Sequence, residues 1–380
     1  MAEADVVIAG AGVVGLFTAR ELQRRGAEVL LVDPWEPGHA RQASAGIHRV
    51  IRATHGSDEL YTKWARESRL RFLEMQAGTE TPIYNECGAV VLAETGHDAW
   101  ERATIPTFQR LGIPYLELDP VALTTRFPTF TDRGVSFALY EPEAGFLWAR
   151  NIVRLQFTRF LADGGRFRRV RLSVGDDERP LLDGSPVEAE RTVIANGAWM
   201  GFLLRRTLGR ILRVVRQDII YTSVPENDDR WHADRHPVWI DHGYGAYGIP
   251  DAGGYGFKAA IAWHEADIDL DADDRVVDRS AMARSQQYLA YRFPDIAEQA
   301  IVDQKVCQIV MTPDTHFLLD HHPDHPDVIL AGGGSGSIFK HGPVVGEYVA
   351  GLVQGDWLPD PRFRVGDRHS LSLDESPSGR

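Results

Sequence analysis

Cysteine is scarce in this chain, with only Cys87 and Cys307 among its 380 residues. Two cysteines cannot build a disulfide framework, so we expect a reducing compartment and a cytoplasmic protein. Positive charge is also in deficit, because 54 acidic residues outnumber 41 basic ones and leave a net charge of −13. That charge argues against a nucleic-acid partner and has the wrong sign for an anionic membrane surface.

Long apolar runs are absent as well. No stretch has the length of a transmembrane helix. The first apolar run has the size of a strand and lacks the basic flank of a signal peptide, so no membrane segment is expected. Histidines at metal-ligand spacing are also lacking, and no metal site is predicted. The histidines of the central region are His232, His236, His242 and His264.

An ordinary composition and one strong motif are present. The hydrophobic fraction is 43%, and 380 residues are enough for two domains. Residues 5–9 form an apolar run of strand length, and a G-x-G-x-x-G follows at residues 10–15. Apolar positions at helical spacing then lead to Gly26, and a second buried strand is predicted at 28–32, before Asp33.

This β-α-β pattern predicts a dinucleotide site, and each part has a physical reason. Gly10 allows the turn, Gly12 lets a pyrophosphate reach the backbone, and Gly15 lets the helix pack closely on the strand. The N–H groups and the dipole at the helix start attract phosphate, and Asp33 can accept hydrogen bonds from ribose hydroxyls. An ordinary glycine turn in an α/β domain is the alternative. The motif does not distinguish FAD from NAD.

Two later stretches repeat the pattern of a buried strand followed by a glycine turn. Residues 191–199 combine such a strand with a tight turn, and residues 328–353 combine one with a glycine-rich turn and a helix. Both suit the nucleotide sheet. We therefore predict a discontinuous nucleotide-binding domain made of residues 1–82, 145–210 and 300–370.

A second domain is predicted between these segments. Residues 213–224 and 237–263 have the alternation and the aromatic content of strands. The fold class is therefore α/β, with a Rossmann-like nucleotide domain plus a substrate domain whose mainly antiparallel sheet is flanked by helices. The substrate domain comprises residues 83–144 and 211–299, and residues 371–380 form a polar tail.

Three other stretches carry weaker signals. Residues 114–142 are rich in Pro, Thr and Phe and are predicted as strands and loops, and residues 166–174 are predicted as a strand. The loop-rich connection at 34–58 contains Arg49 and Arg52. Two arginines three residues apart can share one side of a helical turn, although the spacing alone favours a solvated basic turn.

Together, the G-x-G-x-x-G start and the turns at 195–199 and 332–337 resemble the FAD-dependent amine oxidases of the D-amino-acid-oxidase superfamily. Within that superfamily, the closer resemblance is to the group of monomeric sarcosine oxidase and N-methyltryptophan oxidase, and it covers nearly the whole chain. It implies that the nucleotide domain binds FAD and that the chain is an enzyme that acts as a monomer.

The reaction implied by the resemblance is the oxidation of a secondary, N-methyl or cyclic amino acid, held by its carboxylate, from amine to imine. O₂ is then reduced to hydrogen peroxide. One alternative is an FAD-dependent dehydrogenase of an amino or hydroxy acid with another electron acceptor. Another is a flavin-binding subunit without turnover of its own.

The resemblance also implies roles for five catalytic residues. Arg49 lies beside the isoalloxazine, while Arg52 and Lys340 bind the substrate carboxylate. The guanidinium of Arg52 can bind both carboxylate oxygens, and the ammonium of Lys340 adds a compact positive charge. Lys258 serves the reaction with oxygen by stabilising developing negative charge, and Tyr247 matches an active-site tyrosine. Without the resemblance, Lys258 would be a surface lysine and Tyr247 an aromatic packed on the sheet.

Cys307 matches the cysteine to which the family attaches its flavin, which implies a thioether to the flavin 8α-carbon. A small buried thiol is the alternative. The other implied FAD contacts come from the glycine turns and their neighbours: Gly10, Gly12, Val13, Val14, Gly15, Asp33, Ser44, Arg49, Val174, Gly197, Gly334, Gly336, Ser337, Ile338 and Lys340.

Two positions depart from the family pattern. Ala262 stands where the family has a histidine, four residues after its oxygen lysine, and Ile309 stands where it has a tyrosine. Both positions line the substrate cavity in the family, so we expect a substrate other than sarcosine, bulkier or more apolar. His264 is a candidate to supply the missing imidazole if its strand continues unbroken.

Overall fold

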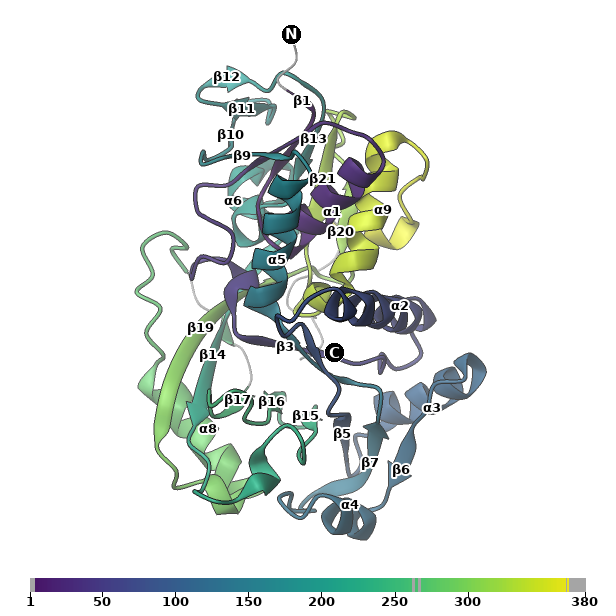
Figure 1. The fold of residues 1–380 in the computed structure, drawn as a ribbon, viewed down its shortest axis with the longest axis vertical. Coiled ribbons are helices and arrows are strands. Elements are labelled where there is room, and N and C mark those ends of the chain that lie inside the picture. The colour runs from purple at the N-terminus through teal and green to yellow at the C-terminus, as the bar shows by residue number, and fades with distance from the viewer. Residues whose placement is uncertain (1–3, 262–263, 266–267, 367, 369–380) are drawn as a thin grey trace.

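The computed structural model describes residues 4–261, 264–265, 268–366 and 368. The molecule is elongated, with one large sheet in each half (Figure 1). This arrangement confirms the predicted α/β class with two kinds of sheet. Within the described residues, no helix is both long enough and apolar enough to cross a membrane. The tail predicted at 371–380 lies outside the described residues.

A six-stranded sheet occupies the upper half of Figure 1, in the order β20-β21-β13-β1-β2-β9. β20 is antiparallel to β21, and the pairings of the other described strands in this sheet are parallel. The strands predicted for the nucleotide sheet are confirmed. β1, β2 and β21 are short apolar runs that are almost wholly buried, as expected for a parallel sheet covered by helices, whereas β9 is charged and partly exposed. The strands of the sheet have the bounds β1 (Ala4–Ala9), β2 (Val29–Val32), β9 (Arg166–Arg168), β13 (Ala189–Ile194), β20 (Leu318–His321) and β21 (Val328–Gly332), and of these β1, β2, β13 and β21 are the predicted ones.

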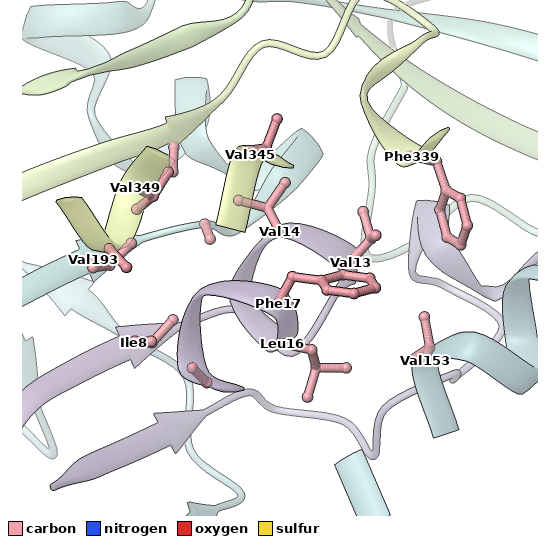
Figure 2. Close-up of a cluster of buried hydrophobic side chains, with 14 of the residues drawn as sticks. Ile8, Val13, Val14, Leu16, Phe17, Val153, Val193, Phe339, Val345 and Val349 are labelled. Carbon is pink, nitrogen blue, oxygen red and sulfur yellow. The ribbon is translucent and has the colours of Figure 1, made fainter. Parts of the chain in front are cut away.

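Helices pack against this sheet and against one another. They are α1 (Val13–Arg24), α2 (Glu59–Ala77), α5 (Ala149–Ala162), α6 (Met200–Leu203), α7 (Arg205–Leu208) and α9 (Gly342–Gln354). Figure 2 shows Val14 and Phe17 of α1 in one apolar cluster with Val345 of α9. A Cβ atom on Gly346 would lie 2.6 Å from the backbone of Phe17, so glycine is required for this close approach. The packing fixes the position of the α1 N-terminus.

The nine-stranded sheet in the other half is mainly antiparallel, as predicted. Its order is β18-β14-β17-β16-β15-β5-β7-β6, with β19 also paired to β14, and β15 with β5 is a parallel pair. The sequence grouped residues 300–370 with the nucleotide domain, whereas β19 lies in this larger sheet. The bounds are β5 (Ala89–Glu94), β6 (Leu116–Leu118), β7 (Val135–Glu141), β14 (Arg213–Thr222), β15 (Val238–Asp241), β16 (Ala246–Ile249), β17 (Phe257–Ile261), β18 (His264–Glu265) and β19 (Ile301–Met311).

Helices α3 (Ala99–Leu111), α4 (Pro120–Arg126) and α8 (Arg279–Arg292) belong to this second half. Helix α4 corrects the prediction of strands and loops for residues 114–142. The side chain of Asp119 accepts a hydrogen bond from the N–H of Ala122 at 2.7 Å, and Pro120 supplies the first helical position. This cap and proline are a helix-start signal that outweighs the strand-like composition around them.

Two small sheets complete the fold. One pairs β3 (His48–Ile51) and β4 (Tyr84–Asn85) with β8 (Gly145–Trp148), and the other contains β10 (Ser173–Val174), β11 (Pro180–Leu182) and β12 (Ser185–Pro186). The idea of a helical turn carrying Arg49 and Arg52 is wrong, because residues 48–51 are held extended by pairing with residues 145–148. The single strand predicted at 166–174 is divided between β9 and β10.

Candidate active site

A cavity of about 770 Å³ is lined by residues of both large sheets. Its walls join the turns after β1, β13 and β21 to side chains of β14, β16 and β19. The carboxyl ends of parallel strands are where α/β sheets bind ligands, and this volume is typical of cofactor and small-molecule sites. Of the predicted site residues, the cavity is lined by all except Gly15, Val174 and Lys258.

At one end of the cavity, the start of α1 offers backbone donors. Gly12 and Val14 line the cavity, and no described residue accepts a hydrogen bond from either N–H group. The hydroxyl of Ser44 accepts from the N–H of Val13 at 3.1 Å. The first turn carries no acidic side chain, so the free N–H groups and the helix dipole favour an anion at this point.

The glycines of this turn are required by space as well as by conformation. Gly10 has φ +111°, and a Cβ atom there would lie 2.3 Å from the carbonyl oxygen of Ala195. A Cβ atom on Gly15 would lie 1.8 Å from the carbonyl oxygen of Gly10. Gly15 therefore packs behind the cavity wall, which explains why it does not line the cavity.

Asp33 lies at the carboxyl end of β2 and faces the same end of the cavity. Its carboxylate accepts hydrogen bonds from the N–H groups of Ala11 at 2.8 Å and Trp35 at 2.9 Å, and from Gln42 Nε2 at 3.1 Å. Burial raises the pKa of this carboxyl, and the three donors act in the opposite direction. The donors hold the carboxylate in one orientation beside the turn.

Two further turns face the cavity. Gly197 follows β13 with φ +56°, and the turn after β21 contributes a group of lining residues: Gly333, Gly334, Ser335, Gly336, Ser337 and Ile338. Gly336 has φ +80°, a backbone conformation that L side chains rarely adopt. Val174 lies on β10 outside the lining, whereas Val170 and Leu172 are part of it.

Positive side chains gather in another part of the cavity. Arg52 follows the end of β3, and Lys340, only 6% exposed, lies in the 3-10 turn Ile338–His341. The guanidinium of Arg52 stacks over the Trp100 ring at 5.5 Å and donates to the carbonyl of Thr54. Two cations from positions 288 residues apart in sequence therefore line one cavity.

The electrostatics of these two cations favour an anionic ligand. Burial lowers the pKa of Arg52 to about 10, with nearby Glu141 and Glu101 opposing the shift. Burial lowers the pKa of Lys340 well below its usual value, and the charge of Arg52 lowers it further. A bound carboxylate would relieve both effects, because it restores hydrogen bonds and neutralises the repulsion.

Glu141 of β7 is the buried carboxylate behind Arg52. It accepts hydrogen bonds from the N–H groups of Ala53 at 2.6 Å and Thr54 at 3.2 Å, and from the Thr54 hydroxyl at 2.9 Å. These bonds hold the segment that follows Arg52. Glu141 of the larger sheet thereby fixes the segment next to Arg52, which follows β3 of a small sheet.

Arg49 and Cys307 meet on the cavity wall. Arg49 Nη1 donates to the carbonyl of His48 at 2.9 Å, and Arg49 Nη2 lies 3.7 Å from Cys307 Sγ. Gln217 of β14 is the strand partner of Cys307, and its Nε2 has no hydrogen-bond partner among the described residues. The thiol is partly exposed and faces a cavity that also holds an unused amide donor.

Lys258 and Tyr247 form an adjacent pair on β17 and β16. Lys258 is 1% exposed, and its Nζ has no hydrogen-bond partner among the described residues. Its Nζ lies 4.9 Å from the centre of the Tyr247 ring, and Tyr247 lines the cavity. Burial lowers the pKa of Lys258 to about 7, and the charge of Arg49 adds to the shift. A buried amine of this kind keeps little of the solvation that a surface lysine has.

One polar pair in the lining was missed by the sequence analysis. His242 lines the cavity, and its Nδ1 lies 2.5 Å from Oε1 of the buried Glu101. The two residues are 141 positions apart and carry no motif, so no local signal indicated the pair. Of the two departures from the family pattern, Ile309 lines the cavity, whereas Ala262 and the side chain of His264 lie outside the described residues.

Comparisons with known proteins identify the family of the chain. The chain is 26% identical over 364 residues to a monomeric sarcosine oxidase from Bacillus sp. (strain B-0618), covering 92% of each chain. It is 24% identical to an N-methyl-L-tryptophan oxidase from Salmonella heidelberg (strain SL476), covering 92% of this chain and 95% of the relative. The structure of fructosamine oxidase from Aspergillus fumigatus superimposes with a TM-score of 0.81 at 20% identity, covering 99% of this chain and 93% of that one. Residues 5–352 match the family described as DAO, FAD dependent oxidoreductase, and the chain therefore belongs to that family of FAD-dependent enzymes.

Proposed function

We propose that this enzyme oxidises a secondary, N-methyl or cyclic amino acid to the corresponding imine and passes the electrons to O₂, which yields hydrogen peroxide. The observation that carries the proposal is the presence of Arg52 and Lys340 in one cavity, both desolvated and with no carboxylate salt-bridge partner among the described residues. Such a pair suits the carboxylate of an amino acid.

The residues at the other end of the cavity fit FAD. The free N–H groups of Gly12 and Val14 suit its pyrophosphate, and Asp33 suits the ribose hydroxyls. When bound, FAD supplies the two-electron chemistry, and the protein supplies orientation and charge. Cys307, beside Arg49 in the lining, is our candidate for a thioether to the flavin.

Substrate orientation follows from the cavity wall. A carboxylate on Arg52 and Lys340 fixes one end of the substrate and leaves its amine and side chain to the remaining lining. Ile309 and Ile240 are apolar contributors to that lining. We therefore propose a substrate whose side chain or ring is bulkier or more apolar than that of sarcosine.

Lys258 is our candidate for the reaction with oxygen. A cation held in a dry site stabilises negative charge that develops nearby far more strongly than one in water. Lys258 touches the ring of Tyr247 and does not itself line the cavity, so the alternative of a dehydrogenase with another acceptor is retained.

An anaerobic screen tests the proposal. The purified yellow protein is mixed without oxygen with sarcosine, N-methyltryptophan, proline and other N-methyl and cyclic amino acids, and loss of flavin absorbance is recorded. We expect bleaching by at least one amino acid, fast return of colour on mixing with O₂, and one hydrogen peroxide per turnover. Bleaching with slow reoxidation supports the dehydrogenase, and no bleaching by any compound contradicts both functions.

We further propose that the chain acts as a cytoplasmic monomer with the two domains expected from the sequence. The scarcity of cysteine and the family resemblance support this proposal. Light scattering of the purified protein at several concentrations tests the monomer, since a mass near twice 42.4 kDa would contradict it.

A further inference from the structure

The His242–Glu101 pair is the strongest feature of the cavity that the proposed function does not use. His242 is the only imidazole among the described residues of the lining. Its Nδ1 lies 2.5 Å from Glu101 Oε1, and the side chain of Glu101 is 2% exposed. A buried carboxylate in this position takes the Nδ1 proton as a hydrogen bond and leaves the lone pair on Nε2.

The pair stands next to the carboxylate anchor. The Trp100 ring contacts both groups, with its centre 4.5 Å from that of the His242 ring and 5.5 Å from the guanidinium carbon of Arg52. Gly56 makes room for this indole, since a Cβ atom there would lie 2.7 Å from Trp100 Nε1. His242 and Arg52 therefore share the Trp100 indole as a neighbour, which places the imidazole close to the group that would hold the substrate carboxylate.

Amine oxidation gives such a base a task. An amino acid arrives at neutral pH as the ammonium form, whose nitrogen lone pair is bound to a proton and cannot be oxidised. Among the described lining residues near Arg52, the other basic side chains are Arg49 and Lys340, and a carboxylate bound to Lys340 favours its protonated form, which cannot accept that proton. Resting on the proposed function, we propose that His242, oriented by Glu101, accepts the proton that the substrate ammonium must lose before its C–N bond is oxidised.

The step balances without an added reactant. The N–H bond of the ammonium breaks, the proton forms the second N–H of an imidazolium at Nε2, and the electron pair stays on the substrate nitrogen. Glu101 stabilises the imidazolium through the existing hydrogen bond. In this scheme His242 is a catalytic residue and Glu101 a positioning residue.

The charges around His242 make its proton affinity depend on whether the substrate is bound. Burial lowers the pKa of His242, as does the charge of Arg52, while Glu101 and Asp241 raise it. These charged groups come from different elements: Arg52 follows β3, Glu101 lies on α3 and Asp241 ends β15, and Glu94 of β5 lies beside the neighbouring Gly243. When the substrate carboxylate neutralises Arg52, the proton affinity of His242 rises at the moment the ammonium is delivered.

The first experiment compares the holoenzyme with His242→Gln. The rate of anaerobic flavin reduction is measured against pH with the N-methyl or cyclic amino acid that bleaches the wild type. At pH 7 the limiting rate should fall about 10²-fold, in the range typical of lost general-base catalysis. The difference should close as the pH approaches the pKa of the substrate's own amine, because the solvent then removes the proton.

Two further variants sharpen the test. Glu101→Gln keeps a hydrogen-bonding side chain and removes the charge, so the acid limb of the pH profile should move to lower pH with a rate loss of about tenfold. His232→Gln is the matched control, because His232 pairs with Asp251 at 3.2 Å and does not line the cavity. It should leave the rate and the profile unchanged.

A binding measurement separates proton transfer from recognition. Benzoate, a carboxylate without an amine, should perturb the flavin spectrum of His242→Gln with a Kd within twofold of the wild type. The inference is overturned when His242→Gln leaves both the reduction rate and its pH profile unchanged. It is also overturned when the variant changes only the substrate concentration that gives half the limiting rate, or when it no longer binds benzoate. Wild-type flavin that no amino acid reduces refutes the proposed function itself, whereas reduction that is independent of His242 refutes this inference alone.

Discussion

The two ends of the cavity are built in different ways. The end at α1 is made largely of backbone groups from short contiguous stretches, within residues 10–14 and 333–338. The cationic end is made of single side chains that converge from distant positions, among them Arg52, Lys340 and His242. The first end depends on the absence of side chains, and the second depends on the charge and partners of each side chain.

The difference predicts how each end fails. At Gly10 and Gly15 the backbone site has no room for added atoms, because the strand, turn and helix touch one another directly there. A site made of convergent side chains keeps its shape when one of them is truncated, but it loses the contact of that side chain with the ligand. The pKa values of the remaining cations then change, because a neighbouring charge has been removed. Substitutions at the α1 end should therefore lower the FAD content, and substitutions at the cationic end should lower turnover while FAD stays bound.

The largest effect is expected at Gly15. Gly15→Val places atoms on the carbonyl oxygen of Gly10, so the purified variant should lack FAD and melt at a lower temperature. Gly26→Ala is the control at the other end of α1, where φ is +91° and a Cβ atom meets nothing within 4 Å. This variant should keep its FAD, and its free energy of unfolding should fall by about 1 kcal/mol. Full flavin absorbance in Gly15→Val would show that the close packing is not required.

Arg52→Met tests the other end. The variant should hold FAD normally and lose about 10³-fold in kcat/KM, because truncating one partner of a desolvated charge pair costs about 2–5 kcal/mol. Arg66→Met is the control, since Arg66 is exposed on α2 and donates to the carbonyl of Leu111 at 2.8 Å. Equal losses in the two variants would indicate general destabilisation and would remove Arg52 from the carboxylate site.

Lys258→Met should slow flavin reoxidation about 10²-fold and change flavin reduction by only a few-fold. Because the pKa of Lys258 is lowered to about 7, its charge disappears as pH rises through that value. Wild-type reoxidation should therefore slow with rising pH near 7, and the variant should show no such dependence. The control is Lys305→Met, whose amine is paired with Asp303 at 2.8 Å and which does not line the cavity. The oxygen role is refuted when stopped-flow traces show both half-reactions unchanged in Lys258→Met.

The smallest effect on turnover is expected at Cys307. Acid precipitation should leave wild-type flavin in the pellet, whereas Cys307→Ser should release it to the supernatant with less than about tenfold loss in rate. Cys87→Ser is the control, because burial raises the pKa of the Cys87 thiol to about 12 and the residue does not line the cavity. Flavin that leaves the wild-type protein on precipitation would exclude the covalent link.

The sequence predicted the fold better than it predicted contacts between distant residues. Strands β1, β2, β13 and β21 were predictable because each is a short apolar run beside a glycine turn, a purely local pattern. Helix α4 was missed because its signal, the Asp119 cap before Pro120, is a single residue pair in a strand-like composition. The helical turn at Arg49 failed because pairing with a strand about 97 residues away decides that conformation.

The site divides in the same way. Glycine turns were located from spacing, whereas the joint placement of Arg52 and Lys340 came only from family resemblance. Glu141 and the His242–Glu101 pair had no signal at all, because tertiary packing alone brings these carboxylates beside their partners. Val174 was assigned to the cofactor by resemblance, and the structure has Leu172 in the lining instead.

Strand β19 has a mechanical consequence. It pairs with β14 along its length, and at its far end the N–H of Ser335, in the turn after β21, donates to the carbonyl of Val310 at 2.8 Å. A flavin bonded to Cys307 in the middle of this strand and bound at the N-terminus of α1 would cross-link the two halves of the molecule. Without the flavin, the two halves would unfold as separate units. The prosthetic group would therefore determine the cooperativity of unfolding as well as the colour of the protein.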